Sequence, residues 1–317
     1  MPYAGKSVMR NLRPLAALFS ISLLLIPTPV SAWNATGHRL IAAIAYDRLT
    51  PKARARVDEL IKQHPDYEKL FLQNAPADPA ARARAAFITA AVWPDQIKGD
   101  PRFYDETRAN ATPTPLLPGF PDMARHTTWH YYDTPYAPDG AEPEHQKPPH
   151  ALSELNRIIP LIGNKDGASN PVYLLPWLEH IEGDVHQPLH CVSRFLKSQP
   201  KGDAGGNFVF IGTRNLHSLW DGAAGNDTSE AYAVKYIADA TAAHPKKGRM
   251  EKKPEKWIAE GFRLAVSDVY TFGLETGTRE HPLPMPDGYE AHAAQVAQQR
   301  IAIAGYRLAA ILNEKLK

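Results

Sequence analysis

One cysteine, Cys191, is present among 317 residues, so the chain can form no intrachain disulfide. The scarcity of cysteine also argues against a structural zinc finger, which binds its metal largely through thiolates. A strong excess of charge is lacking as well, because 36 basic residues face 34 acidic ones. This balance excludes the overall basic surface of a duplex-DNA-binding domain. Stability must therefore come from a packed core or from bound metal.

Long apolar runs are also scarce, and the one candidate lies near the N-terminus. Three basic residues and no acidic residue precede an apolar run at 15–26, which is shorter than the roughly 20 residues that a membrane-spanning helix needs. The small-residue sequence VSA follows at 30–32, and this arrangement is typical of a secretory signal and its cleavage site. We therefore expect removal of residues 1–32, leaving a mature chain that begins at Trp33 and does not enter a membrane.

The expected destination is the periplasm or the cell exterior. Because the leader carries three basic residues and no acid, the mature chain would have 33 basic residues against 34 acidic ones. An exported chain without disulfides fits a bacterial periplasm better than a eukaryotic secretory pathway, where disulfides are common. A secreted or periplasmic protein of bacterial origin is therefore the expectation.

Apolar residues at helical spacing recur along the rest of the chain. The expected helices lie around 40–44 and 51–61 and over 79–93, 151–162, 171–186, 229–243, 255–272 and 289–315. Proline-rich sequence without periodicity from 100 to 150 predicts long surface loops, and the glycine-rich segment 197–214 is expected to include a small hairpin. These patterns predict an all-α fold, with a single mainly helical domain over 33–317 and function-bearing loops.

Histidine and aspartate are concentrated in the sequence HIEGDVHQPLH at 180–190. His180 and Asp184 stand four apart, which on a helix places both side chains on one face, near enough to bind one cation. His217 and Asp221 repeat this spacing, and His190 follows the first pair. One such pair alone is more simply a hydrogen bond on a helix surface. Two pairs with His190 in an apolar context favour metal, because burying these groups without a cation carries a large desolvation cost.

Zinc is the metal that this combination of side chains favours. Histidine nitrogens with aspartate oxygens, and no thiolate cluster, are typical of catalytic zinc sites. Magnesium prefers carboxylates and water, and calcium takes more oxygen ligands, so neither explains the histidines.

Six motifs carry a resemblance to a known family. They are WNATGH at 33–38, WPDQIK at 93–98, WHYYD at 129–133, HIEGDVHQPLH at 180–190, GDAGGN at 202–207 and NLHSLWD at 215–221. In this order they resemble the zinc-dependent single-strand-specific nucleases of the S-one/P-one type, also called 3′-nucleotidase/nucleases, which are related in fold to zinc phospholipase C. The motifs extend over about two thirds of the mature chain. The resemblance implies a mainly helical fold with long loops around a trinuclear zinc cleft.

The resemblance also implies which residues hold the three Zn²⁺ ions. The first ion would be bound by Asp95, His130, His180 and Asp184. The second would be bound by the amine and carbonyl of Trp33, by His38, and by Asp184 as a bridge. The third would be bound by His190, His217 and Asp221. An α-amino group titrates near pH 8, far below lysine, and gives up its proton to a metal readily, so cleavage before Trp33 would be required to complete the site.

The implied activity is hydrolysis of phosphodiester bonds in single-stranded DNA and RNA to 5′-phosphate products, together with 3′-nucleotidase activity. The implied catalytic residues are Asp95, Lys98 and Asp184. Tyr131 stands where the family places a phenylalanine that stacks on a base, and Lys98 and Asp133 complete the implied substrate-binding set. A solvated surface lysine and a turn-forming aspartate are the alternatives for Lys98 and Asp133. No obligate protein partner is evident.

Two other functions remain open at this point. A zinc phospholipase C-like phosphodiesterase would share the fold, but that family spaces its first histidine further from the N-terminal tryptophan and completes the third zinc with glutamate, where this chain has Asp221. A non-catalytic periplasmic zinc-binding protein would need neither Lys98 nor Tyr131 beside its metal.

Overall fold

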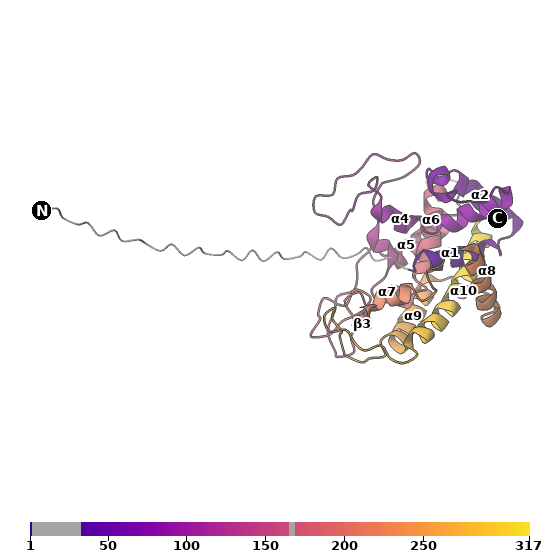
Figure 1. The fold of residues 1–317 in the computed structure, drawn as a ribbon. Coiled ribbons are helices and arrows are strands. Elements are labelled where there is room, and N and C mark those ends of the chain that lie inside the picture. Colours follow the sequence, from indigo (N-terminus) through magenta and orange to yellow (C-terminus); the bar gives the residue numbers. More distant parts are fainter. Residues whose placement is uncertain (2–32, 165–168) are drawn as a thin grey trace. The chain divides into compact units, whose positions relative to one another are not determined.

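The computed structural model describes Met1, residues 33–164 and residues 169–317 (Figure 1). The expected leader and its cleavage site therefore lie outside the described residues. The helices, including short 3-10 and π segments labelled η, are α1 Ala35–Tyr46, α2 Pro51–Lys62, η1 Tyr67–Phe71, α3 Pro79–Ala90, α4 Trp93–Gln96, η2 Ile97–Gly99, η3 Thr127–His130, α5 Ala151–Leu161, α6 Pro171–Asp184, η4 Pro188–Cys191, α7 Leu216–Asp221, α8 Glu230–Ala243, α9 Pro254–Leu264, η5 Ala265–Val269 and α10 Tyr289–Lys315. The expectation of a mainly helical fold is confirmed.

Most long helices begin at a side chain that caps them. Asn34, Thr50, Asp78 and Ser229 each accept a hydrogen bond from a backbone N–H in the first turn of α1, α2, α3 and α8. Such caps satisfy donors that have no partner inside the helix. The predicted starts of α2 and α3, each with a proline in the first turn, are confirmed.

The first helix lies at the centre of the packing within the unit Ser31–Lys317. Helix α1 contacts α3, α6, α8 and α10, and ten of its twelve residues are buried. Glycines permit the closest approaches. A side chain on Gly305 of α10 would collide with Ile44, and one on Gly183 of α6 would stand 3.0 Å from His38 Nδ1. The N-terminal motif is thereby placed against the helix that carries HIEGD.

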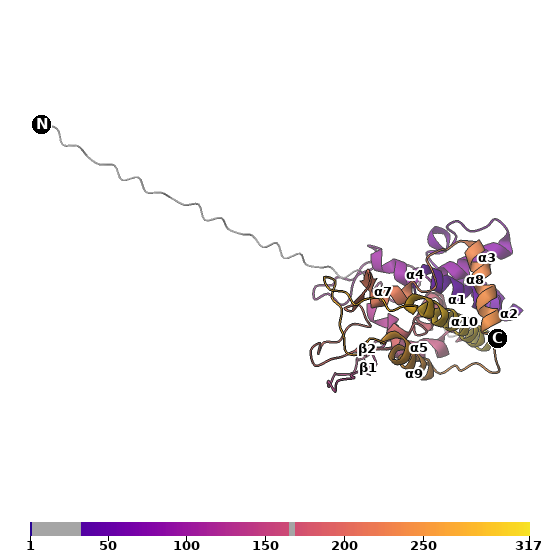
Figure 2. The ribbon, with the colours of Figure 1, turned by 60° about the horizontal axis from the view of Figure 1, so that its bottom comes forward.

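Short strands tie the loops to one another. Strand β1, Pro135–Tyr136, pairs in parallel with β2, Ser193–Arg194, and Figure 2 labels the two one above the other, to the left of α5 and α9. This pairing joins the segment after His130 to the segment after His190. Strands β3, Phe210–Ile211, and β4, Arg214–Asn215, form the expected small hairpin directly before α7.

One helix boundary differs from the sequence prediction in a way that matters for the site. The predicted helix 79–93 ends at Ala90, and Asp95 lies inside a separate short helix, α4, rather than at the end of α3. Pro94 explains the break, because proline has no N–H to donate and fits only the first turn of a helix. Helices α6 and α9 also end earlier than predicted, at Asp184 and Leu264, and the five residues after α9 form a π turn.

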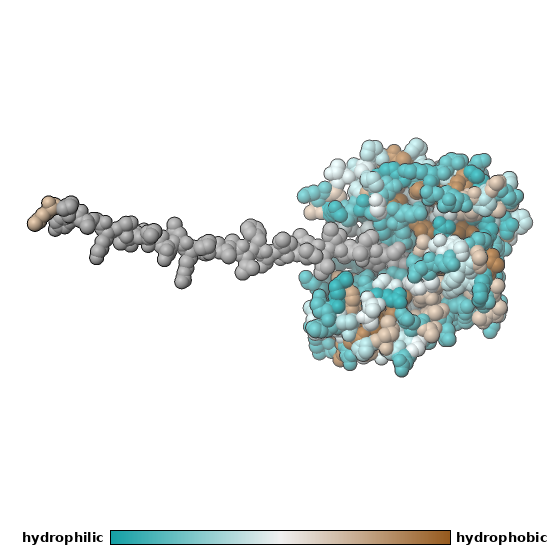
Figure 3. Space-filling view, in the orientation of Figure 1, coloured by the Kyte–Doolittle hydropathy of each residue, from teal (hydrophilic) through white to brown (hydrophobic). Residues whose placement is uncertain are grey.

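The visible surface is mainly hydrophilic, with apolar side chains scattered over it (Figure 3). In the part of the chain that the structure describes, no helix combines the length and hydropathy needed to cross a bilayer.

Replacing Gly305 with valine should destabilise the fold, because the added side chain must displace Ile44 at the contact between α1 and α10. Overpacking of this kind lowers the free energy of unfolding by about 1–3 kcal/mol. Urea unfolding measures the effect. Ala294→Val, at an exposed position of α10, is the matched control and should change the free energy of unfolding much less. Equal effects of the two substitutions would contradict the proposed packing.

Candidate metal centre

Three groups of buried or half-buried ligand-type side chains lie close enough to hold metal ions. Each group has ligand atoms within 4.8 Å of one another. The groups are Asp95, His130 and His180; His38, His180 and Asp184; and His190, His217 and Asp221. Every His and Asp side chain that the sequence assigned to a zinc ion therefore appears in at least one group.

The first group converges from three elements: α4 supplies Asp95, η3 supplies His130, and α6 supplies His180 together with Asp184 of the second group. His130 Nδ1 lies 3.0 Å from His180 Nε2 and 3.1 Å from Asp184 Oδ2. His180 Nε2 lies 3.4 Å from Asp184 Oδ2 and 3.5 Å from Asp95 Oδ1, and His130 Nδ1 lies 3.9 Å from Asp95 Oδ1. Four atoms bound tetrahedrally to zinc at 2.0–2.1 Å stand roughly 3.3 Å apart, so these spacings suit a zinc ion at the centre.

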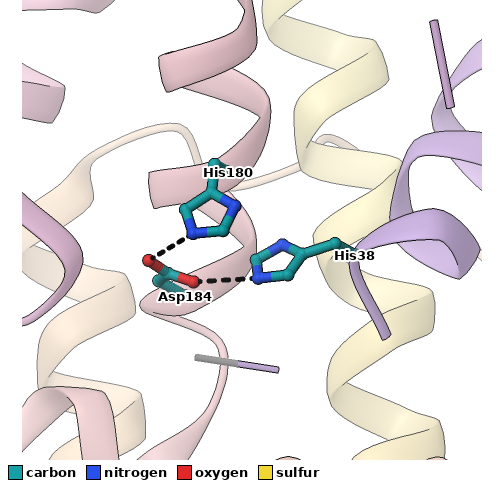
Figure 4. A group of neighbouring side chains, drawn as sticks. All are labelled: His38, His180 and Asp184. Atoms are coloured by element: carbon teal, nitrogen blue, oxygen red, sulfur yellow. Dashed lines mark ion pairs between the residues drawn. The ribbon is translucent and has the colours of Figure 1, made fainter. Parts of the chain in front are cut away.

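Asp184 joins the first group to the second through its two carboxylate oxygens. Oδ1 lies 3.2 Å from His38 Nε2 on α1, whereas Oδ2 faces His130 and His180. Figure 4 shows the carboxylate beside the two rings, with one oxygen directed at His38, the other directed at His180, and each contact marked. The two imidazoles stack with centroids 3.9 Å apart. A carboxylate placed in this way can bridge two cations.

Trp33 lies at the edge of this arrangement. Its side chain is fully buried, and its Cβ stands 2.7 Å from where a side chain on Gly37 would begin. The backbone N–H of the next residue, Asn34, donates to the Asp221 carbonyl at 3.2 Å. The segment that begins at Trp33 therefore lies beside the turn that carries His38 of the second group and beside Asp221 of the third.

The third group shows most directly that a positive charge is required. His190 Nε2 and His217 Nε2 face each other at 3.0 Å. The opposite ring nitrogen of His190 donates to the His130 carbonyl, and that of His217 donates to the Gly205 carbonyl, each at 2.7 Å. A neutral imidazole has one N–H, and each ring uses it on a carbonyl. The two Nε2 lone pairs therefore meet without a proton between them, next to the Asp221 carboxylate at 3.9 Å and 3.5 Å.

The same orientation recurs at His180, whose Nδ1 donates to the Ala91 carbonyl at 2.8 Å. Hydrogen bonds of this kind fix the tautomer and aim the other nitrogen at a metal. Gly205 makes one of them possible: its φ is +60°, and a side chain there would stand 2.6 Å from the Leu189 carbonyl.

Burial opposes charge on these side chains when no cation is near. Burial lowers the pKa of His38 and of His217 to about 4, and it raises the pKa of Asp184 and of Asp221 well above the usual range. Asp95 differs: burial would raise its pKa, but Lys98 and His180 outweigh burial and hold it well below the usual range. A divalent cation would reverse the penalty on the carboxylates.

Unpartnered atoms support the same conclusion. His38 Nε2 and Asp184 Oδ1, the two ligand atoms that face each other in the second group, are buried and have no hydrogen-bond partner among the described residues. Buried polar atoms are almost always hydrogen-bonded. Together with the donor set, these atoms fit bound zinc.

Lys98 lies beside the first group, and Tyr131 and Asp133 follow His130 in the same segment. Lys98 Nζ donates to Asp95 Oδ1 at 2.7 Å, and both side chains are largely shielded from solvent. The solvated-lysine alternative is therefore wrong. Burial raises the pKa of Asp133 to about 7, and the neighbouring Asp203 adds to the shift. Burial also raises the pKa of Tyr131, again with a contribution from Asp133.

Gln187 is a site residue that the sequence reasoning missed. Its side-chain amide donates to Asp221 Oδ1 at 2.7 Å, and its side-chain oxygen accepts from the Leu189 N–H at 2.6 Å. The available signal was its position inside HIEGDVHQPLH, between two groups of ligands. His186, in the same segment, turns away from the ligand groups: Nδ1 donates to the Glu182 carbonyl, and Nε2 contacts Arg307 on α10.

Comparisons with known proteins agree with this geometry. The family described as S1/P1 Nuclease matches residues 33–317. Nuclease S1 of Aspergillus oryzae is 26% identical over 184 residues, which cover 51% of this chain and 61% of that protein, less than two thirds of its length. Endonuclease 2 of Arabidopsis thaliana is 25% identical over an alignment that covers 96% of this chain and 97% of that protein. Endonuclease 5 of the same plant is 30% identical over 44% of this chain and 49% of that protein.

Replacing Gln187 with methionine should weaken metal binding at the third group, because Asp221 loses the donor that orients its carboxylate. Loss of a partner that orients a metal ligand typically costs 10–100-fold in affinity. Competition with a zinc chelator measures this change. Gln299→Met, at an exposed position of α10, should leave zinc affinity at its wild-type value. Wild-type affinity in Gln187→Met would contradict the role of Gln187.

The free energy of unfolding should fall as the pH drops from about 6.5 towards 4. In this window unfolded histidines take up protons, whereas His38 and His217, with pKa values of about 4, remain neutral in the fold. At these two positions the unfolded chain therefore binds more protons, and their contribution to stability is lost on acidification. Asp184 and Asp221, whose pKa values are raised, act in the opposite direction unless a bound cation keeps them ionised. Bound zinc makes stability fall on acidification as well, because its ligands must be deprotonated to bind the metal. Denaturant unfolding across the pH range should give a shallower dependence for His217→Gln, and a flat wild-type profile would contradict the assignment.

Proposed function

The chain belongs to the S1/P1 nuclease family, and on that premise we propose that it is a zinc-dependent endonuclease. Its substrates are single-stranded DNA and RNA, which it hydrolyses to 5′-phosphate products, and it also removes phosphate from 3′-nucleotides. The observation that carries the proposal is the pair of imidazole lone pairs of His190 and His217, which meet at 3.0 Å beside Asp221. A bound cation satisfies that arrangement, whereas burial lowers the pKa of both imidazoles and so opposes an added proton.

Three zinc ions complete the proposed site. The first is held by Asp95, His130, His180 and Asp184; the second by His38, Asp184 and the backbone of Trp33; and the third by His190, His217 and Asp221. The spacings within the first and third groups and the unpartnered Nε2 of His38, which faces Asp184, support this set. When bound, zinc supplies Lewis acidity, which lowers the pKa of a coordinated water and offsets charge on phosphate.

The second zinc depends on the proposed processing. If residues 1–32 form a cleaved secretory signal, the amine of Trp33 becomes a free ligand only after export, and the catalytic unit is 33–317. The burial of Trp33 and the contact between Asn34 and Asp221 support this placement of the mature N-terminus. The enzyme would then act in the periplasm or outside the cell, and it would remain incomplete before export.

Lys98 has a role of its own in the proposal. Its ammonium group is largely shielded from solvent and lies 2.7 Å from Asp95 Oδ1, next to the first zinc group. A cation in this position stabilises a phosphate oxygen as negative charge develops on it, and it is more effective in a site that excludes water. The lysine also keeps Asp95 ionised, since it holds the pKa of that carboxyl well below the usual range, together with His180.

The segment that follows His130 supplies the proposed base recognition. Tyr131 is half-buried and directly follows a ligand, so its ring can stack on a nucleobase, an interaction worth roughly 1–3 kcal/mol per base. Asp133 has a pKa of about 7, so near neutral pH its carboxyl group can donate as well as accept a hydrogen bond. A base held in this way has left its stack, which favours single strands over duplex.

The proposal is tested with processed, zinc-loaded protein on single-stranded DNA, duplex DNA, RNA and 3′-nucleotides. Lys98→Met should lower kcat on single-stranded DNA by 10²-fold or more, the typical cost of losing one group that stabilises transition-state charge, and it should retain the zinc. Lys235→Met, at an exposed ion pair on α8, is the control and should match wild type. Equal rates on single-stranded and duplex DNA would contradict the substrate preference. Hydrolysis of phosphatidylcholine without nuclease activity would favour a phospholipase.

A further inference from the structure

A cavity of about 600 Å³ lies on the side of α1 that faces α3 and the start of α8. Figure 2 shows these three helices next to one another, and α1 contacts both of the others. The residues that line the cavity are different from those of the three metal groups. Its size lies within the range of pockets that bind small ligands, about 300–1,000 Å³.

Arg39 is the residue that makes this cavity unusual. Arg39 lines the cavity and is half-buried. Nη1 makes one long hydrogen bond, 3.5 Å, to Thr89 Oγ1, and the buried Nε has no partner among residues 33–164 and 169–317. In the described part of the chain, no carboxylate forms an ion pair with Arg39. A guanidinium removed from water without a counter-charge is costly.

The other arginine of the cavity is already neutralised. Arg84 forms ion pairs with Asp47 at 2.8 Å and with Glu230 at 3.4 Å, and these carboxylates raise its pKa. The positive charge of Arg39 is therefore left without a partner in the cavity. Both arginines lie on the wall made by α1 and α3.

The remaining lining indicates what kind of anion would fit. Polar side chains that can donate hydrogen bonds lie at Asn74, Thr89 and Thr228, and apolar side chains lie at Ala85 and Ile88. The one carboxylate in the described lining, Glu230, is paired with Arg84. A guanidinium with amide and hydroxyl donors matches the oxygens of a phosphate group. The apolar surface and the volume leave room for a nucleoside attached to that phosphate.

We propose that this cavity is a second ligand site, which binds a nucleoside monophosphate with the phosphate group on Arg39. The site needs no metal, because Arg39 supplies the charge. Two residues of the cavity are also close in the sequence to residues of the metal centre. Arg39 follows His38 directly, and Thr89 lies two residues before Ala91, whose carbonyl accepts the hydrogen bond of His180.

Calorimetric titration of the processed, zinc-loaded protein with adenosine 5′-monophosphate tests the proposal. Wild type should bind one equivalent more than Arg39→Gln, which removes the charge, and one more than Ala85→Trp, which fills the cavity. Arg263→Gln, at an arginine on α9 with one hydrogen bond to the Ala259 carbonyl, should bind the same number as wild type. Because a difference in stoichiometry is scored, the result does not depend on whether the metal centre also binds the nucleotide or on nuclease activity.

Two further ligands identify which part of the nucleotide is recognised. Inorganic phosphate should compete for the additional equivalent, and adenosine should not. Zinc content is measured in parallel, and Ala85→Trp preserves the comparison if Arg39→Gln disturbs the adjacent His38. The proposal is overturned if both variants bind as many equivalents as wild type, or if adenosine occupies the additional site as tightly as the monophosphate.

Discussion

The structure depends on the way in which backbone carbonyls orient buried imidazoles. His180, His190 and His217 each donate one ring N–H to a carbonyl, of Ala91, His130 and Gly205 respectively. This leaves the second nitrogen of each ring as a bare lone pair facing other ligands. In a buried site, such an arrangement is stable only around a cation. The positions of the carbonyls are therefore as important to the site as the histidines themselves.

The fold supplies those carbonyls from segments far apart in the sequence. Ala91 lies at the break between α3 and α4 that Pro94 enforces, His130 ends a 3-10 turn, and Gly205 lies in a loop that requires a positive φ. Asp184 then connects two of the groups, because its two oxygens face different histidines. The short parallel pairing of β1 with β2 holds the loop after His130 beside the loop after His190. Irregular segments thus carry much of the site, and the helices fix their positions.

Much of this could be predicted from the sequence. Helices were recognisable from apolar spacing and from caps such as Thr50 and Asp78, and the His/Asp pairs four apart indicated metal before any family was considered. The family resemblance then assigned Asp95, His130 and His38, which are too far from those pairs in the sequence for local spacing to connect them. The roles of Gln187 and of the Ala91 carbonyl could not be predicted, because they depend on which segments meet in three dimensions. The unpaired charge of Arg39 was hidden for the same reason.

The central claim is that these groups hold three zinc ions, one of them through the amine of Trp33. The measurement that tests it most directly is the zinc content of protein whose chain begins at Trp33, compared with the same protein carrying an additional methionine before Trp33. The account predicts three zinc ions per chain in the first protein and fewer, with loss of activity, in the second. Fewer than three zinc ions in the correctly processed protein, or full zinc content and activity in the extended one, would contradict it.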